Sequence, residues 1–304
     1  MARARNAIVC SHTRLDTREG AFVTVFPLRE ATQLNAEMTK FVIEAPAIAR
    51  KALPGQFVII RQDEFGERIP LTISQVDVDA GTICVIFQAV GASTARMRAM
   101  ESGQALRDVT GPLGCPTEFG NARRICVIGG GLGTAIAYPE AKWLHDDGRS
   151  VDCIVGFRTR DIIMLEDELR ACCDTLTVMT DDGSNGNAGF VTVALQHNID
   201  AGAAYDLVIA IGPPVMMRNV CSITRAAGIR TLVSLNSIMI DGTGMCGGCR
   251  VRVGGEYKHA CVDGPDFDGH AVDWDEVMHR ATMYRAYERE AVECRTSGTE
   301  GACA

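Results

Sequence analysis

Three cysteines in the last third of the chain are spaced for binding a metal. The segment Asp241-Gly-Thr-Gly-Met-Cys246-Gly-Gly-Cys249 is followed by Cys261. Glycines beside two cysteines let the backbone wrap closely, so that both sulfurs point at one position. Thiolates in such a spacing bind iron–sulfur clusters and structural zinc, and the spacing by itself leaves both open.

A [2Fe–2S] cluster needs four protein ligands, whereas this segment supplies three sulfurs. Asp241 is the nearest anionic candidate for the fourth position. Its alternative role is to begin an Asp-Gly turn. Cys294 and Cys303, near the C-terminus, are the other candidates.

Composition and charge restrict the class of protein. The chain has 304 residues, 47% of them hydrophobic and 22% charged, which is typical of globular domains. A net charge of −8 argues against nucleic acid or an anionic membrane as a partner. No apolar stretch is long enough for membrane insertion, and no secretory signal is apparent, although an organelle presequence remains open. Most of the 13 cysteines lie in apolar surroundings, which favours free thiols and a cytoplasmic location.

The pattern of apolar runs predicts two domains and a smaller module. Short β-rich runs with Pro and Gly between them predict an antiparallel β-barrel, and a strand, glycine turn and helix repeat predicts a parallel sheet. The expected division is an N-terminal extension (1–20), a FAD-binding β-barrel (21–118), a nucleotide-binding α/β domain (119–230), a C-terminal [2Fe–2S] module with a helix (231–290) and a tail (291–304).

Two segments of the predicted barrel are candidates for binding FAD. The strand from Arg68 to Ser74 has a backbone edge and a hydroxyl for an isoalloxazine ring, with an arginine for the pyrophosphate. Gly91, Ser93 and Thr94 begin a helix where a phosphate can bind, or form an ordinary helix cap. The candidate flavin residues are Arg68, Pro70, Leu71, Thr72, Ser74, Gly91, Ser93, Thr94, Gly111 and Gly114.

The second domain contains a candidate nucleotide site. A glycine-rich turn follows a buried strand and begins a helix, where backbone N–H groups and the helix dipole favour a diphosphate. The turn is not the GxGxxG fingerprint of a first βαβ unit. Two arginines near residue 158 keep NADP open beside NAD. The candidate residues are Gly130, Gly131, Gly133, Thr134, Arg158, Asp181, Asp182, Gly183, Gly212, Pro213 and Met216.

The cysteine segment carries a resemblance to a known family. Residues 233–256 and 259–270 resemble the small subunit of the electron-bifurcating NADH-dependent ferredoxin:NADP oxidoreductase. They are more distantly similar to the iron–sulfur subunit of dihydroorotate dehydrogenase, which has a cysteine where Asp241 stands. The resemblance extends from about residue 23 to residue 290. Ser237 stands where the family has proline, and Ile69 where it has arginine, which leaves the role of Arg68 open.

The resemblance implies a ferredoxin-reductase-like fold and a ligand set. It implies that Asp241, Cys246, Cys249 and Cys261 hold a [2Fe–2S] cluster, that the turn from Gly111 to Gly114 lies beneath the flavin, and that NAD is favoured over NADP. Because a hydride donor delivers two electrons together, the expected order is NADH, FAD, [2Fe–2S] and then a partner protein, or the reverse. No catalytic acid or base is expected.

The resemblance also implies a partner. The chain is expected to pair with a larger flavin and [4Fe–4S] subunit, as a heterodimer or higher assembly. A dihydroorotate dehydrogenase, hydrogenase or sulfide dehydrogenase complex is the alternative, and a zinc or nucleotide-binding module without turnover is the non-enzymatic one. The helix expected over 274–290 either docks a partner or packs on the chain's own core.

Overall fold

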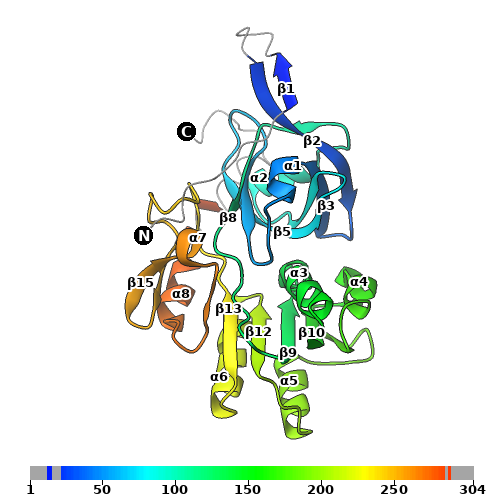
Figure 1. Ribbon diagram of the computed structural model, residues 1–304, viewed down its shortest axis with the longest axis vertical. Coiled ribbons are helices and arrows are strands. Elements are labelled where there is room, and N and C mark those ends of the chain that lie inside the picture. Colours follow the sequence, from blue (N-terminus) through cyan, green and yellow to red (C-terminus); the bar gives the residue numbers. More distant parts are fainter. Residues whose placement is uncertain (1–11, 16–21, 285–286, 289–304) are drawn as a thin grey trace.

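The computed structural model describes residues 12–15, 22–284 and 287–288, and places an antiparallel sheet above a parallel one (Figure 1). The candidates Cys294 and Cys303 lie outside the described residues, as do the tail and most of the N-terminal extension. Within the described part of the chain, no helix is long and apolar enough to cross a membrane.

The first sheet is a strongly curved antiparallel barrel in the order β1-β2-β3-β6-β5-β4-β8, with β7 paired to β2. Alternating side chains of β3 are buried, because one face of each strand lines the barrel core. Phe41 and Phe87 meet edge to face in that core, with ring centroids 5.0 Å apart. The elements are β1 (His12–Leu15), β2 (Phe22–Gln33), β3 (Met38–Glu44), α1 (Pro46–Ala49), β4 (Phe57–Arg61), β5 (Ile69–Asp77), β6 (Thr82–Gln88), α2 (Ala92–Arg98), β7 (Ala105–Leu106) and β8 (Asp108–Leu113).

The second sheet has the order β11-β10-β9-β12-β13-β16, and its first five strands are parallel. Its strands are continuous apolar runs because helices cover both faces. Helices α3 and α4 cover one face, and α5 and α6 the other. The elements are β9 (Arg124–Gly130), α3 (Gly133–Asp146), β10 (Ser150–Phe157), the 3₁₀ helix η1 (Arg160–Ile162), α4 (Glu166–Arg170), β11 (Thr175–Thr180), α5 (Val191–Asp200), β12 (Leu207–Ile211), α6 (Pro214–Ala226) and β13 (Arg230–Ser234).

The third region is partly built into the second sheet. Strand β16 pairs antiparallel with β13, so the expected boundary between residues 230 and 231 falls inside a strand of the sheet. Trp274 and Val277 of α8 pack against the core of that sheet. The elements are β14 (Arg250–Val253), β15 (Glu256–His259), α7 (Ala260–Asp263), β16 (Asp266–Asp268) and α8 (Trp274–Arg280).

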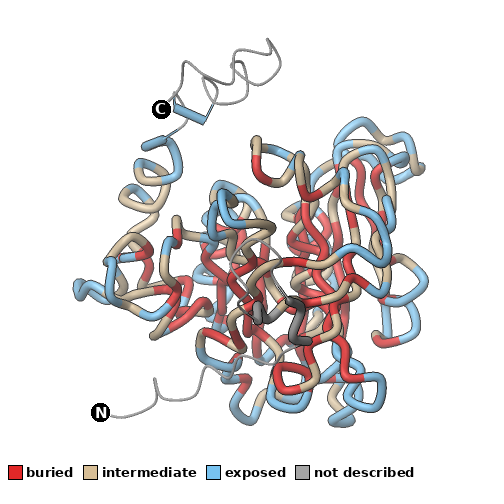
Figure 2. The backbone as a smooth tube through the Cα atoms, turned by 90° about the horizontal axis from the view of Figure 1, so that it is seen from above, coloured by how far each residue is buried: buried red, intermediate tan, exposed pale blue. Residues whose placement is uncertain are grey.

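Direct contacts join the barrel to its neighbours. Ser74 of β5 donates a hydrogen bond to the carbonyl of Ala135 in α3, at 2.8 Å. Asn35 donates to the carbonyl of Ile162, at 3.1 Å. Buried segments run through both sheets, and the connecting loops are mostly exposed (Figure 2).

Candidate functional site

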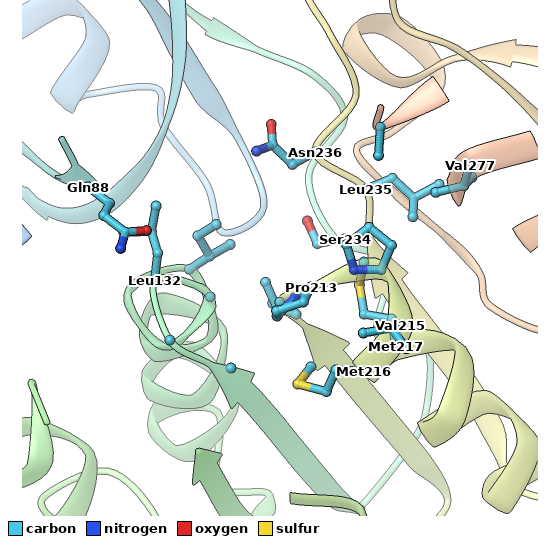
Figure 3. Close-up of a pocket in the computed structure, with 18 of the residues that line it drawn as sticks. Gln88, Leu132, Pro213, Val215, Met216, Met217, Ser234, Leu235, Asn236 and Val277 are labelled. Atoms are coloured by element: carbon cyan, nitrogen blue, oxygen red, sulfur yellow. The ribbon is translucent and has the colours of Figure 1, made fainter. Parts of the chain in front are cut away.

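A cavity of about 850 Å³ lies where the barrel, the parallel sheet and the third region meet. In Figure 3, Gln88 of the barrel and Leu132 of the glycine-rich turn lie across the opening from Pro213 and Met216. Asn236 lies at the barrel side of the opening, and Val277 of α8 lies beyond Leu235. The cavity therefore has walls from all three parts of the molecule.

The glycine-rich turn forms one wall, at the point where the order of the sheet reverses. Strands β9 and β12 are neighbours, and the helices that follow them, α3 and α6, lie on opposite faces. Open α/β sheets bind ligands at such a point. A Cβ on Gly133 would lie 2.2 Å from the carbonyl oxygen of Ile211, so only glycine lets α3 begin this close to β12.

Most of the candidate nucleotide residues line this cavity. Three do not line it, namely Thr134, Asp182 and Gly183. Thr134 is fully buried, and Asp182, next to Gly183, accepts hydrogen bonds from Ser184 in its own loop. Arg158 forms an ion pair with Glu37 of the barrel, so it joins two walls of the cavity. The candidates that line the cavity are Gly130, Gly131, Gly133, Arg158, Asp181, Gly212, Pro213 and Met216.

The candidate flavin residues lie elsewhere, and none lines this cavity. Thr94 accepts a hydrogen bond from the backbone N–H of Gly91, at 3.0 Å, which is the ordinary capping role. Ser93 donates to the carboxylate of Glu67. The remaining candidates belong to β5 (Pro70, Leu71, Thr72 and Ser74), to β8 and the turn after it (Gly111 and Gly114), and to the segment before β5 (Arg68).

The four candidate metal ligands fall into two pairs, and the first pair is Cys249 and Cys261. Their sulfurs are 3.2 Å apart, both thiols are buried, and the backbone N–H of Cys261 points at the sulfur of Cys249 at 3.5 Å. Burial, followed by the neighbouring Cys249 thiol, raises the pKa of Cys261 to about 12. Binding a metal here would release that proton.

The second pair is Asp241 and Cys246, on the exposed loop between β13 and β14. The Asp241 carboxylate accepts backbone hydrogen bonds from Thr243 at 2.6 Å and from Cys246 at 2.9 Å. Burial raises the pKa of this carboxyl, but hydrogen bonds from the side chains and the backbone N–H groups of Thr243 and Cys246 outweigh burial and hold the pKa below its usual range. Asp241 therefore begins a turn, and its carboxylate is anionic.

The loop is held against the barrel. A Cβ on Gly242, whose φ is +78°, would lie 2.9 Å from side chains of Ile59 and Leu113, so this glycine sits directly on strands β4 and β8. Arg68 donates a hydrogen bond to the carbonyl of Ile240, at 3.1 Å. The flavin segment and the cysteine loop are therefore in contact.

The donor set fits an iron–sulfur site in chemistry and order, although it is not assembled. Within the ranges that the structure describes, no three His, Cys, Asp or Glu side chains converge on one metal position. A pair of facing thiols, an exposed third thiol and an anionic carboxylate nonetheless lie on one loop and the helix that follows it. Anionic sulfur and oxygen are the ligands that such a cluster uses.

Two features were missed by the sequence analysis, and the first is Arg280 in the last turn of α8. Arg280 lines the cavity and donates a hydrogen bond to the carbonyl of Gly248, at 2.7 Å. The sequence separates these residues widely, and no motif links them.

The second missed feature is a buried acid pair at the joint between the three parts. Thr117 lies beside both carboxylates, Glu140 of α3 at 3.1 Å and Asp266 of β16. A hydroxyl has one proton to donate, so one of its two carboxyl partners must itself carry a proton. Burial raises the pKa of Asp266 to about 6, and burial together with the charge of Asp266 raises that of Glu140.

Comparison with known proteins agrees with this arrangement. The sequence pattern of the iron–sulfur cluster binding domain of dihydroorotate dehydrogenase B matches residues 236–273, which include all four candidate ligands. An uncharacterised protein of the adh 3′ region of Clostridium beijerinckii is 46% identical over 89% of this chain and 95% of its own. A homologue of the electron transfer subunit of dihydroorotate dehydrogenase B (NAD(+)) from Thermotoga maritima is 43% identical over 86% of this chain and 92% of its own.

A solved structure gives the same result for the fold. A chain of the NADH-dependent reduced ferredoxin-NADP oxidoreductase, a structure reported for its insights into flavin-based electron bifurcation, is 39% identical and superimposes with a TM-score of 0.84. The superposition covers 89% of this chain and 98% of that one. The predicted fold class, the oxidoreductase class and the iron–sulfur expectation are confirmed. The chain belongs to the family of dihydroorotate dehydrogenase B electron transfer subunits and their homologues.

Proposed function

We propose that this chain is the NAD(H)-linked electron-transfer subunit of a bifurcating NADH-dependent ferredoxin:NADP oxidoreductase. The observation that carries the proposal is the whole-length likeness to a chain of that enzyme, at 39% identity and a TM-score of 0.84. The cofactors are FAD, a [2Fe–2S] cluster and NAD(H). The likeness extends over barrel, sheet and cysteine loop together, so it supports the complete set of cofactors and not one site alone.

The residues of the chain bind and orient these groups. The backbone N–H groups of the turn after β9 and the N-terminus of α3 attract the diphosphate of the nucleotide. The cluster would be held by the four candidate ligands Asp241, Cys246, Cys249 and Cys261. Bound FAD accepts two electrons from NADH and gives them singly to an iron–sulfur centre. Because Gly242 packs on the barrel, the cluster loop lies directly beside the flavin segment.

The cluster loop is also the surface proposed to contact the larger flavin and [4Fe–4S] subunit. Ile240 and Met245, whose side chains are 57% and 89% exposed, flank the candidate ligands Asp241 and Cys246. Exposed apolar side chains beside an electron-carrying group suit a protein interface. Met245→Asp is therefore expected to weaken association with the partner, whereas Val193→Asp, at a position on α5 that is as exposed as Ile240, is expected to leave it unchanged.

Hydrogen exchange tests this contact. Exchange across residues 245–284, measured with and without the copurified partner, is expected to slow around Met245 on assembly. Unchanged exchange there, with the lone chain rapidly reducing a small acceptor, would favour a free-standing reductase.

The cofactor assignment is tested on the purified chain under anaerobic conditions. One FAD and about two iron ions with two labile sulfides are expected per chain, the content of one [2Fe–2S] cluster. NADH is expected to bleach the flavin much faster than NADPH does. Equal or reversed rates would remove the NAD assignment, and a colourless preparation would leave a zinc or nucleotide-binding module.

The second candidate function is electron transfer to a dihydroorotate dehydrogenase. It is favoured by the 43% identity to a homologue of that enzyme's electron transfer subunit. The copurifying subunit separates the two candidates. A partner whose flavin is reduced by dihydroorotate would establish the second candidate, and one that exchanges electrons with both NADP(H) and ferredoxin would establish the first.

A further inference from the structure

The side chain of Arg280 lies between the cavity and the cluster loop. It lines the cavity, and its Nη2 donates to the carbonyl of Gly248 at 2.7 Å. That carbonyl belongs to the peptide that precedes Cys249, and the N–H of Gly248 points at the sulfur of Cys246 at 3.4 Å. Arg280 therefore lines the cavity, and its guanidinium contacts the short segment between two candidate ligands.

Helix α8 holds Arg280 in place. Asp273 caps the helix by accepting from the backbone N–H of Glu276, at 3.0 Å. Trp274 donates its indole N–H to the carbonyl of Gly269, at 3.1 Å. Val277, one turn before Arg280, packs on the core of the sheet and faces the cavity in Figure 3. The arginine is thus presented to both sites by a fixed helix.

We propose that Arg280 is a positioning residue that links occupation of the cavity by an anionic nucleotide to the iron–sulfur loop. The inference rests on the proposed function and goes beyond it, because it assigns communication between two of its sites. A guanidinium has five N–H donors, and the bond to Gly248 uses one.

The direction of the effect follows from bond strength. Hydrogen bonds from a guanidinium to a charged oxygen are stronger than those to a neutral carbonyl. A nucleotide phosphate that engages the free donors therefore pulls the guanidinium toward the cavity and weakens its bond to Gly248, which loosens the peptide before Cys249 and moves a positive charge away from the cluster. Coupling of this kind is reciprocal, so the state of the loop alters nucleotide affinity by the same factor.

The test uses the full chain loaded with FAD and cluster, in its oxidised form, with NAD⁺ as the probe. Circular dichroism at wavelengths beyond the flavin absorption reports the cluster, and calorimetry reports NAD⁺ binding. NAD⁺ is expected to change the cluster spectrum of the wild type. Arg280→Gln is expected to remove that change and to weaken NAD⁺ binding by about tenfold, the effect of one charge-assisted hydrogen bond.

Two further variants make the result specific. Arg280→Lys keeps the charge but lacks the planar guanidinium, so it should show a reduced spectral change. If Arg280→Gln loses iron, the lysine variant is the one that tests the role of Arg280. Arg218→Gln removes an ion pair to the same helix, at Asp275, without reaching the cavity or the loop, and should behave as wild type.

The outcomes separate this inference from the proposed function. A wild-type response in both Arg280 variants overturns the inference. A wild-type cluster spectrum that does not change when NAD⁺ binds also overturns the inference, and it leaves the proposed function standing. A wild-type chain that binds no NAD⁺ overturns the proposed function and the inference together.

Discussion

The nucleotide cavity and the cluster loop differ in how far the fold alone completes them. The cavity is lined by eight of the predicted nucleotide residues, and its shape depends on backbone positions such as Gly133 at the start of α3 and Gly212 directly after β12. In the loop, the candidate ligands form two separate pairs, and the Asp241 carboxylate is engaged by Thr243 and Cys246. Packing alone forms the nucleotide cavity, whereas the ligands of the cluster loop are present but do not yet converge on one position.

The difference follows from what each site is made of. Backbone groups at the end of a buried strand are held by the hydrogen bonds of the sheet, whether or not a ligand is present. Side chains on an exposed loop have no such constraint, and ligation itself supplies the free energy that draws them together. The comparison predicts that changes in the loop remove the cluster without dismantling the cavity, and that changes in the cavity leave the cluster assembled.

The largest effect is expected from replacing a thiol ligand. Cys249→Ser should reduce bound iron to roughly a tenth of the wild-type content or less, because serine is a poor ligand for a cluster. FAD content should remain, as measured by absorbance, and calorimetry should show that NAD⁺ still binds. Cys173→Ser, just before the opposite edge strand β11, should retain the cluster. Simultaneous loss of FAD from Cys249→Ser would show that the cluster loop is also needed to hold the flavin.

A smaller loss is expected at Asp241. Asp241→Ala should leave roughly a third or less of the iron, because it removes both a ligand and the turn. Asp241→Asn keeps an oxygen that can accept from Thr243, so it preserves the turn and isolates the role as ligand. Asp241→Cys is expected to retain a cluster with altered absorption.

The asparagine variant decides between the two roles of Asp241. A visible spectrum and iron content equal to those of the wild type would show that Asp241 only shapes the turn. An unaltered cluster in the alanine variant as well would direct attention to Cys294 or Cys303.

The backbone-built site is tested at Gly133. Gly133→Ala should lower the free energy of unfolding by about 2 kcal/mol, because the new methyl group meets the carbonyl of Ile211 and overpacks the junction. Urea unfolding measures the loss, and calorimetry should show weaker NAD⁺ binding with iron unaffected. Gly91→Ala is the matched control, since a Cβ there meets nothing within 4 Å. Equal stability of Gly133→Ala and wild type would show that the cavity tolerates rearrangement.

The smallest effect is a pH dependence at the buried acid pair. Burial raises the pKa of Asp266 from 3.8 to about 6, so its contribution to stability is complete below about pH 4 and is lost as pH rises through about 6. Asp266→Asn should remove this dependence and gain about 1 kcal/mol over wild type at pH 8. Thermal unfolding from pH 5 to pH 8 measures it. Asp268→Asn, exposed on the same strand, should keep the wild-type profile.

The sequence was informative where local pattern determines structure. The run from Leu207 to Ile211 has the bounds of β12, because a strand buried on both faces is a continuous apolar run. The spacing of the cysteines also predicted a metal site without knowledge of the fold, and the resemblance favoured an iron–sulfur cluster over zinc.

Long-range pairing was not readable in the same way. Asp266 lies between a proline and a phenylalanine, a local sequence that also occurs in surface turns. It is buried only because β16 pairs with β13. Ser93 was a candidate for a phosphate, yet its hydroxyl is engaged by Glu67 from a segment far away in the chain. Neither partner is marked by any local pattern.

The pairing of β16 with β13 has a consequence for how this protein can be divided. Removing the cysteine module would strip the sheet of its antiparallel edge strand and leave β13 with unpaired backbone groups along one side, a template for aggregation. A shortened chain ending near residue 235 would therefore be difficult to produce as a stable flavoprotein. The iron–sulfur module is not a cassette that can be exchanged between reductases, because it carries part of the nucleotide domain's own sheet.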